Sequence, residues 1–317
     1  MTRVLVTGAT GFVGSHIAAR FAAAGHRLRC TVRSTSDTRW LEGVEAEQVL
    51  MDLAAPDRRL EDALQDVDLV VHAAGITRAS VRGDYMRINA DGSERLLRAA
   101  ASAGVRTFVF VSSLAARGPD GHSGPVSPYG WSKRAAEEKL RACGGTTRVI
   151  VLRPAGVYGP RDAELLPLFR MAARGWLPAP RSARPLQPVY VEDVARAALR
   201  AAEGEVGFGP HAVAAPTRYS WREAARLFGV AVGRRVRLVT LPGAAFEAAG
   251  CLLEVAALPQ RRAPRFDRRR ARDLARYGWT CDVAPTEAAL SWRAEVALPE
   301  GLARTAAWYR ERGWLSD

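Results

Sequence analysis

The first fourteen residues constrain the fold of this chain more than any other stretch. Residues 3–7 are rich in Val and Leu, which is typical of a short buried strand, and glycines follow at positions 8, 11 and 14. An amphipathic run over residues 12–24 then predicts a helix. In parallel α/β sheets this order binds dinucleotides, because the glycines let the backbone approach the pyrophosphate at a helix N-terminus. The expected binding residues are Gly8, Thr10, Gly11, Phe12, Val13 and Gly14.

Strand and helix patterns alternate through the first 200 residues, as they do in a doubly wound α/β sheet. Further strands are predicted at residues 26–32, 44–51, 68–75 (with its turn), 106–112 and 148–152, and a strand followed by a helix at 187–195. Helices are predicted at 56–65, 85–103, 129–141, 165–174 and 303–312, and an irregular Pro-rich loop at 175–185. The apolar residues 241–258 include two glutamates and predict a buried or partner-facing helix, not a membrane span.

The residues that end the second strand indicate which cofactor binds. A dinucleotide site usually has Asp or Glu there, to hold the adenosine ribose hydroxyls. Here Val32 occupies that place, and Arg33 and Ser34 follow. A guanidinium can pair with a 2′-phosphate that a carboxylate would repel. NADP(H) is therefore favoured, while NAD(H) stays possible if Arg33 faces solvent and Asp37 serves the ribose.

The composition, 48% apolar and 25% charged residues, is that of an ordinary soluble globular protein. The first strand begins at residue 3, which leaves no room for a signal peptide, and the four cysteines are scattered. We therefore expect a cytoplasmic protein without a metal site and without a membrane partner. The net charge of +13 is spread along the chain, and its densest run, residues 261–272, has few aromatics. A solvated basic face is favoured over nucleic-acid binding.

A tyrosine and a lysine four residues apart open the helix predicted at 129–141. That spacing places Tyr129 and Lys133 on one helix face. A nearby ammonium stabilises tyrosinate and lowers the tyrosine pKa, so Tyr129 can exchange a proton with substrate near neutral pH while hydride moves to or from a nicotinamide. The chain contains two lysines, Lys133 and Lys139, and otherwise uses arginine. A lysine at 133 therefore indicates a role for the compact ammonium itself.

Together these motifs resemble the extended branch of the short-chain dehydrogenase/reductase superfamily. The resemblance rests on Thr-Gly-Ala-Thr-Gly-Phe-Val-Gly at residues 7–14, Tyr-x-x-x-Lys at 129–133 and Arg-Pro-x-x-Val-Tyr-Gly-Pro at 153–160. It implies a seven-stranded, mostly parallel Rossmann sheet with a small, discontinuous C-terminal lobe that binds substrate. The implied sheet domain is 1–160 with 186–206, and the implied lobe is 161–185 with 207–317.

The resemblance also assigns roles to single residues. Ser113 would bind the substrate oxygen beside Tyr129 and Lys133, with Ser112 as the fallback. Asn89 would be tied to the wall of the active site, whereas His72 is expected to be a packed side chain. Further cofactor contacts are implied for Asp52, Leu53, Ala73, Ala74, Gly75, Ser112, Tyr129, Lys133, Pro154 and Val157. A homodimer is expected through the helices at 85–103 and 129–141, as in extended relatives.

The fold alone does not decide the reaction. The favoured function is an oxidoreductase for a hydroxyl/ketone pair, resembling dihydroflavonol reductases and 3β-hydroxysteroid dehydrogenases. The alternatives are a nucleotide-sugar epimerase or dehydratase and a cofactor-binding regulator without chemistry. Sugar-nucleotide enzymes usually clamp the diphosphate with an arginine where this chain has Leu186, and Arg184 is the nearby substitute. An apolar pocket beside Tyr129 would favour the reductase, and an arginine-lined pocket the sugar nucleotide.

Overall fold

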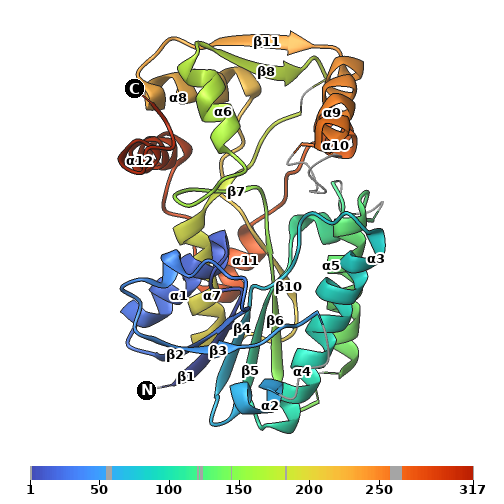
Figure 1. Cartoon of the computed structure of the whole chain (residues 1–317), viewed down its shortest axis with the longest axis vertical. Helices are drawn as coiled ribbons and strands as arrows, with labels where there is room; N and C mark the ends of the chain where they lie inside the picture. The colour runs from blue at the N-terminus through green and yellow to red at the C-terminus, as the bar shows by residue number, and fades with distance from the viewer. Residues whose placement is uncertain are drawn as a thin grey trace.

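The central element is a seven-stranded sheet in the order β10-β6-β5-β4-β1-β2-β3, in which every neighbouring pair is parallel (Figure 1). The computed structural model describes residues 2–54, 59–119, 121, 124–143, 145–182, 184–257 and 266–316. The strands are β1 (Arg3–Thr7), β2 (Arg27–Val32), β3 (Ala46–Leu50), β4 (Leu69–His72), β5 (Thr107–Val111), β6 (Arg148–Pro154) and β10 (Pro210–Val213). The predicted Rossmann sheet is confirmed.

Helices cover both faces of this sheet, which is why its strands are apolar without alternation. Val4 and Val6 of β1 pack into the core on one face, and Leu5 packs into the core on the other. The first face is covered by α1 (Phe12–Ala23), α7 (Val191–Glu203) and α11 (Ala284–Leu290), and the second by α2 (Arg59–Leu64), α4 (Gly92–Ser102) and α5 (Pro128–Cys143). Strand order reverses beside β1, which pairs with β2 on one side and β4 on the other. Ligands bind in α/β sheets at the carboxyl ends of the strands beside such a reversal.

A second lobe stands over the carboxyl ends of the strands (Figure 1). Its core includes Phe169, Phe228 and Tyr309, whose rings meet edge to face at centroid distances of 4.9 and 5.0 Å. The lobe contains α6 (Leu166–Ala173), β8 (Trp176–Pro180), α8 (Trp221–Val232), β11 (Arg237–Leu241), α9 (Gly243–Ala257), α10 (Arg268–Arg276) and α12 (Leu298–Glu311). Between it and the large sheet lie β7 (Val157–Tyr158) and β9 (Val189–Tyr190), which pair with each other.

Three local predictions need correction. Residues 175–185 are not all loop, because β8 pairs in parallel with β11. Strand β10 lies in the range 207–317 that we assigned to the lobe, yet it is an edge strand of the central sheet. The helix predicted at 85–103 is divided into α3 (Arg82–Tyr85), a π-helical segment at Met86–Asp91, and α4.

The apolar segment predicted at 241–258 forms α9, but the helix is not buried. Its side chains Leu252 and Val255 are 71% and 61% exposed. Residue 258 and the first arginines of the basic run, 261, 262 and 265, lie outside the described residues. Among the described residues, no helix is long and apolar enough to cross a membrane.

Candidate active site

The glycine turn after β1 is packed so tightly that side chains could not replace its hydrogens. Gly8 has a φ of +73°, and a Cβ there would lie 2.6 Å from the backbone nitrogen of Ala74. A Cβ on Gly14 would lie 2.1 Å from the carbonyl oxygen of Gly8. Gly11, between them, is exposed and is the N-cap of α1 without a side-chain partner for the helix N–H groups. The turn therefore presents open helix N–H groups, which bind phosphate well.

A second turn, after β4, packs against the first. The backbone nitrogen of Ala73 donates to Thr7 O at 3.1 Å, and that of Ala74 donates to Thr7 Oγ1 at 3.3 Å. His72 is buried and is hydrogen bonded through Nδ1 to Thr7 Oγ1 at 2.6 Å, so its expected packing role is confirmed. Burial and the nearby Lys133 lower the pKa of His72 to about 3. A histidine held neutral in this way fixes the two turns relative to each other.

Asn89 is a buried polar side chain that joins the segment after this turn to α5. Its Oδ1 accepts from the nitrogen of Ile76 at 2.8 Å, and its Nδ2 donates to the oxygen of the same residue at 2.9 Å. Nδ2 also donates to Ser132 Oγ at 2.9 Å on α5. Asn89 lies in the π-helical segment, a distortion that is frequent at functional sites. A Cβ on Gly75 would lie 3.0 Å from Asn89 Oδ1, so a small residue is needed there.

The two serines after β5 have different surroundings. Ser112 is buried, and its hydroxyl donates to Glu137 Oε1 at 2.5 Å. Glu137 also receives two hydrogen bonds from Arg153, at 3.0 and 2.5 Å. Ser113 instead lines a cavity, and its hydroxyl accepts from the backbone nitrogen of Ala115 at 3.2 Å. The geometry therefore favours Ser113 over Ser112 as the residue that meets substrate.

Lys133 is buried on the same helix as Tyr129, one turn further along. Its Nζ donates to the carbonyl oxygen of Val111 at 2.8 Å and lies 4.3 Å from the centre of the Phe110 ring. Burial lowers the pKa of Lys133 to about 7, and the charge of Glu137 opposes that shift. The ammonium is therefore held at the carboxyl end of β5 by a carbonyl and an aromatic face.

The expected direction of the Tyr129 pKa needs correction. Burial raises the pKa of Tyr129, while the nearby Ser113 hydroxyl and the charge of Arg270 oppose that shift. In this structure the groups that act on the phenol are Ser113, Arg270 and Tyr85, and Lys133 is directed to Val111 instead. A phenol that keeps its proton at neutral pH can act as a hydrogen-bond donor and a general acid.

The residues expected at the adenosine end lie beyond the ends of β2 and β3. Arg33 is exposed, and its guanidinium forms no ion pair among the residues that the structure describes. Asp37 is held instead by Arg39, in an exposed ion pair. Asp52 is exposed and accepts from the nitrogen of Ala54 at 2.8 Å, and Leu53 packs against α4 at Gly92. Arg33 therefore remains available to a ligand.

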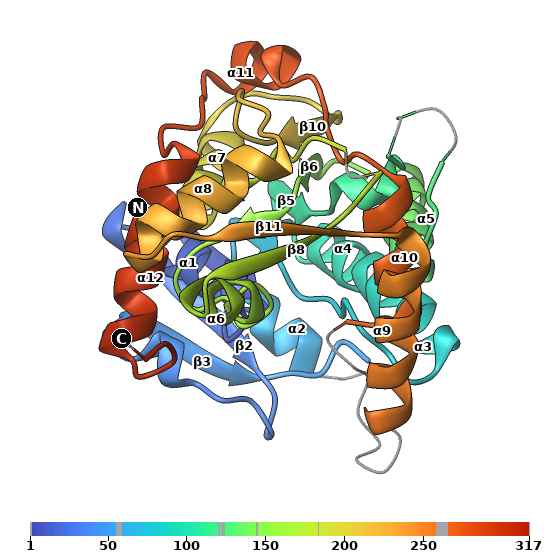
Figure 2. The ribbon, with the colours of Figure 1, turned by 90° about the horizontal axis from the view of Figure 1, so that it is seen from above.

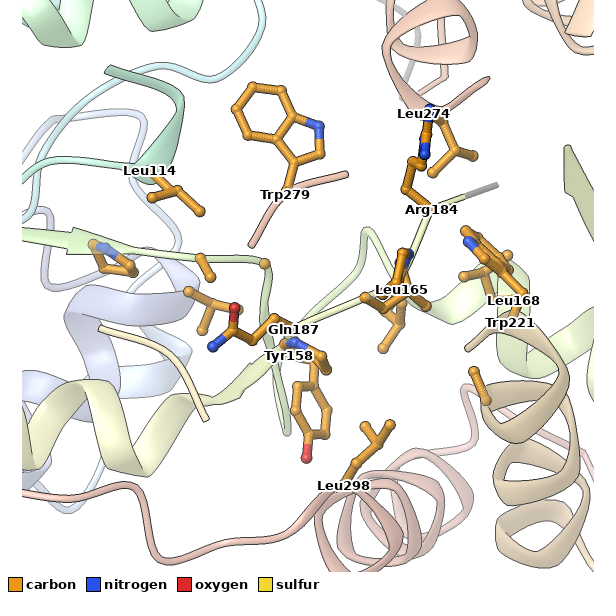
Figure 3. A pocket seen from close by; sticks show the side chains of 18 of the residues that line it. Leu114, Tyr158, Leu165, Leu168, Arg184, Gln187, Trp221, Leu274, Trp279 and Leu298 are labelled. Carbon is orange, nitrogen blue, oxygen red and sulfur yellow. The ribbon is translucent and has the colours of Figure 1, made fainter. Parts of the chain in front are cut away.

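A cavity of about 420 Å³ extends from Ser113 into the second lobe. Figure 3 shows Leu165, Leu168, Trp221 and Leu298 around this space. Pro154 and Val157 lie on the wall, where the resemblance implied a contact to the nicotinamide. Most other wall side chains are apolar, and they come from both the sheet domain and the lobe: Leu114, Leu177, Leu186, Ala224, Phe228, Leu274, Tyr277, Trp279 and Leu302.

Sequence patterns did not reveal these cavity residues. Leu165 and Leu168, like Leu298 and Leu302, have the spacing of an ordinary core-facing helix stripe. Arg270 was also missed, because it lies within a basic run that reads as a solvated face. The segment from Phe266 to Trp279 also resembles a C-terminal segment of the extended family, and that resemblance could have pointed to Tyr277 and Trp279.

Comparisons with known proteins agree with this geometry. The model of the NAD dependent epimerase/dehydratase family matches residues 4–213, and the chain belongs to that family. The expected membership of the extended short-chain dehydrogenase/reductases is thereby confirmed. The chain is therefore an enzyme of a family that uses a nicotinamide dinucleotide.

Its relatives include both reductases and sugar-nucleotide enzymes. The ceramide reductase of Caulobacter vibrioides is 33% identical over 314 residues, which cover 98% of this chain and 96% of that protein. The 4-hydroxy-2-methyl-3-oxo-4-farnesyl-3,4-dihydroquinoline-1-oxide ketoreductase of Stigmatella aurantiaca is 30% identical over 185 residues, 54% of this chain and 55% of that protein. The solved structure of MoeE5 in complex with UDP-glucuronic acid and NAD matches with a TM-score of 0.77 and 26% identity, over 98% of this chain and 99% of that chain.

Proposed function

We propose that this enzyme reduces a ketone on a long-chain, lipid-like substrate, with NADPH as the preferred cofactor. The observation that carries the proposal is the apolar cavity that begins at Ser113. Its volume of about 420 Å³ is within the ordinary range for small-molecule sites, roughly 300–1,000 Å³. Alkyl chain transferred into such a site gains about 0.8 kcal/mol per buried methylene, whereas a sugar diphosphate would lose hydration there.

Relatives support a substrate with an apolar chain. Ceramide and farnesyl groups, which appear in the names of two reductases similar to this chain, both contain long hydrocarbon segments. Leu165, Leu168 and Leu298 offer such a segment an apolar wall. We infer that the hydrocarbon lies in the lobe and that the carbonyl lies at the Ser113 end.

Ser113, Tyr129 and Lys133 divide the chemistry between them. A bound nicotinamide supplies the hydride. Ser113 and Tyr129 donate hydrogen bonds to the carbonyl oxygen, and Tyr129 gives that oxygen its proton as the carbon is reduced. The raised pKa of Tyr129 suits this direction, because the phenol is protonated before the reaction. In the reacting complex, the positive charge of Lys133 would stabilise the tyrosinate that forms as Tyr129 gives up its proton.

The residues present fit a dinucleotide. The open N-terminus of α1 at Gly11 would hold the pyrophosphate, and the close-packed turns at Gly8 and Gly75 leave backbone uncovered by side chains. Arg33 would pair with the 2′-phosphate of NADP(H), while Asp52 and Leu53 would hold the adenine. NAD(H) is the alternative, and it is the cofactor bound in the MoeE5 complex.

A nucleotide-sugar epimerase or dehydratase remains the second candidate, on one observation. Arg184 lies on the cavity wall and could pair with a diphosphate. Among the described wall residues it is the one charged side chain, and the position usual for the clamping arginine is Leu186. One guanidinium at the edge of an apolar cavity supports the reductase better.

A substrate panel tests the proposal. Purified enzyme with NADPH is mixed with long-chain ketones, hydroxysteroid ketones, UDP-glucose and UDP-glucuronic acid, and both cofactor oxidation and product mass are followed. We expect NADPH to be consumed with the long-chain ketones. Conversion of a UDP-sugar without net cofactor consumption, together with inert ketones, would refute the reductase.

We also propose a homodimer through α4 and α5. Trp131 of α5 is 56% exposed, and Met86, at the start of the π-helical segment that leads into α4, is 41% exposed, which leaves apolar surface for a partner. Sedimentation of the enzyme at micromolar concentration should give twice the mass of 34.3 kDa. A monomer at that concentration would contradict the proposal.

A further inference from the structure

Helix α9 (Gly243–Ala257) turns its charged residues inward. Glu247 faces α10, where its carboxylate accepts from Arg272 at 2.9 Å. Glu254 also faces α10 and accepts from the backbone nitrogen of Arg268 at 3.2 Å. The two helices approach closely at Gly250, where a Cβ would lie 2.7 Å from that same nitrogen. Both carboxylates of α9 are therefore occupied within the helix pair.

The outward face of α9 is apolar. Leu252, Leu253 and Val255 are 71%, 48% and 61% exposed. Every exposed side chain on α9 whose exposure the structure describes is Ala, Cys, Leu or Val. A surface helix in water ordinarily shows charged and polar residues to the solvent. A contiguous apolar face of this kind marks an interaction site.

The helix that packs against α9, α10, carries exposed arginines. Arg269 and Arg276 are seven residues apart, so they lie on one side of the helix, and both are exposed. Neither forms an ion pair with another described residue, in contrast to Arg272, which is bound to Glu247. The surface thus combines an apolar face with exposed cations, which is the pattern of helices that lie in the interface of anionic membranes.

The position of the helix pair links this surface to the cavity. Figures 1 and 2 show α9 and α10 side by side at the outer edge of the second lobe. Leu274 of α10 and Tyr277 just after it line the cavity wall. One helix therefore borders both the exposed apolar face and the space proposed for substrate.

We propose that α9 and α10 dock on an anionic lipid bilayer, with Leu252, Leu253 and Val255 in the acyl boundary and the arginines of α10 on lipid phosphates. The fifteen residues of α9 are too few to cross a hydrocarbon core, which takes about twenty, so the helix lies along the surface. This proposal replaces our expectation that the protein has no membrane partner. Docking itself does not depend on the reaction, but its role in supplying substrate rests on the proposed function.

Vesicle co-sedimentation of the full chain tests the docking. Vesicles of phosphatidylglycerol and phosphatidylcholine should bind the enzyme, and vesicles of phosphatidylcholine alone should bind it at least ~10-fold more weakly. The double variant Leu252→Ser/Leu253→Ser should lose at least ~10-fold in partitioning, because each methylene removed from the boundary contributes about fourfold. Val230→Ser, at a 68% exposed valine on α8, is the matched control and should bind as the unmodified chain does.

The double variant Arg269→Gln/Arg276→Gln tests whether the positive charges of α10 contribute to vesicle binding. This variant should bind anionic vesicles more weakly and should lose most of the salt dependence of binding. Docking is refuted if the unmodified chain does not bind anionic vesicles, or if the leucine variant binds them equally well. A dimer that the leucine variant dissociates, without vesicle binding by either protein, would assign the face to a second copy of the chain and overturn the proposal.

Turnover of a detergent-dispersed ketone separates this inference from the proposed function. Leu252 and Leu253 do not line the cavity, so the leucine variant should retain that activity while losing turnover of ketone presented in anionic vesicles. If no ketone is reduced in detergent but vesicle binding is intact, the proposed function fails and the docking stands.

Discussion

The buried pair of Glu137 and Arg153 gives a sharp test of how the site is held. Their side chains are 7% and 12% exposed, and Glu137 also accepts from Ser112. Glu137→Gln removes the negative charge and leaves the Arg153 guanidinium buried without a counter-ion. Loss of one partner from a buried pair costs about 3–5 kcal/mol, and we expect about 3 kcal/mol because glutamine keeps the volume and can bond Ser112.

Glu138→Gln is the matched control on the next residue of α5. Glu138 and its partner Arg134 are 63% and 43% exposed, so their ion pair should contribute no more than about 0.5 kcal/mol. Urea unfolding followed by circular dichroism measures both variants against the unmodified chain. Equal losses of unfolding free energy in the two variants would show that the Glu137 network does not support the site.

Three further predictions concern the cofactor and the catalytic residues. Arg33→Ala should reduce the preference for NADPH over NADH by about ten- to hundredfold in fluorescence titrations, since one charge-assisted hydrogen bond contributes roughly 1.5–3 kcal/mol. An unchanged ratio of the two dissociation constants would contradict a role for Arg33. Tyr129→Phe should lower kcat by roughly 10²–10⁴ with little change in cofactor affinity, and Ser113→Ala should lower it less; a fully active Tyr129→Phe enzyme would disprove the proton donor. Burial lowers the pKa of Lys133 to about 7 in the folded chain. Between pH 7 and the ordinary lysine pKa, the unfolded chain therefore binds more protons than the folded chain, and the free energy of unfolding rises with pH. The stability advantage of Lys133→Met at pH 7 should shrink towards pH 10, and an advantage independent of pH would contradict the burial of a charge.

Local sequence patterns predicted the sheet domain well. The turn from Gly8 to Gly14 and the apolar strands beside it depend on neighbouring residues, so their periodicity was readable in the sequence. The spacing of Tyr129 and Lys133 also placed them correctly on one helix. The sequence did not predict the pKa shifts of Tyr129 and Lys133. These shifts depend on burial, and that of Tyr129 also depends on Arg270, which comes from the other lobe.

The substrate lobe was predicted poorly for physical reasons. Strand β8 contains Pro178 and Pro180, which favoured a loop, but it pairs with β11, about sixty residues later, in a two-stranded sheet of the described residues. Prolines are tolerated in such an edge strand because the unpaired side needs no N–H donor. The cavity is equally non-local, since leucines that line an open space have the same helical spacing as leucines in a filled core.

The central claim is that the apolar cavity binds the hydrocarbon of a ketone substrate. The most direct measurement is kcat/KM with NADPH over a series of ketones that differ in chain length, each dispersed in detergent below its solubility limit. We expect kcat/KM to rise by up to about fourfold per added methylene until the cavity is full, and then to reach a plateau. A value that does not change with chain length, or that falls from the shortest ketone onward, would contradict it.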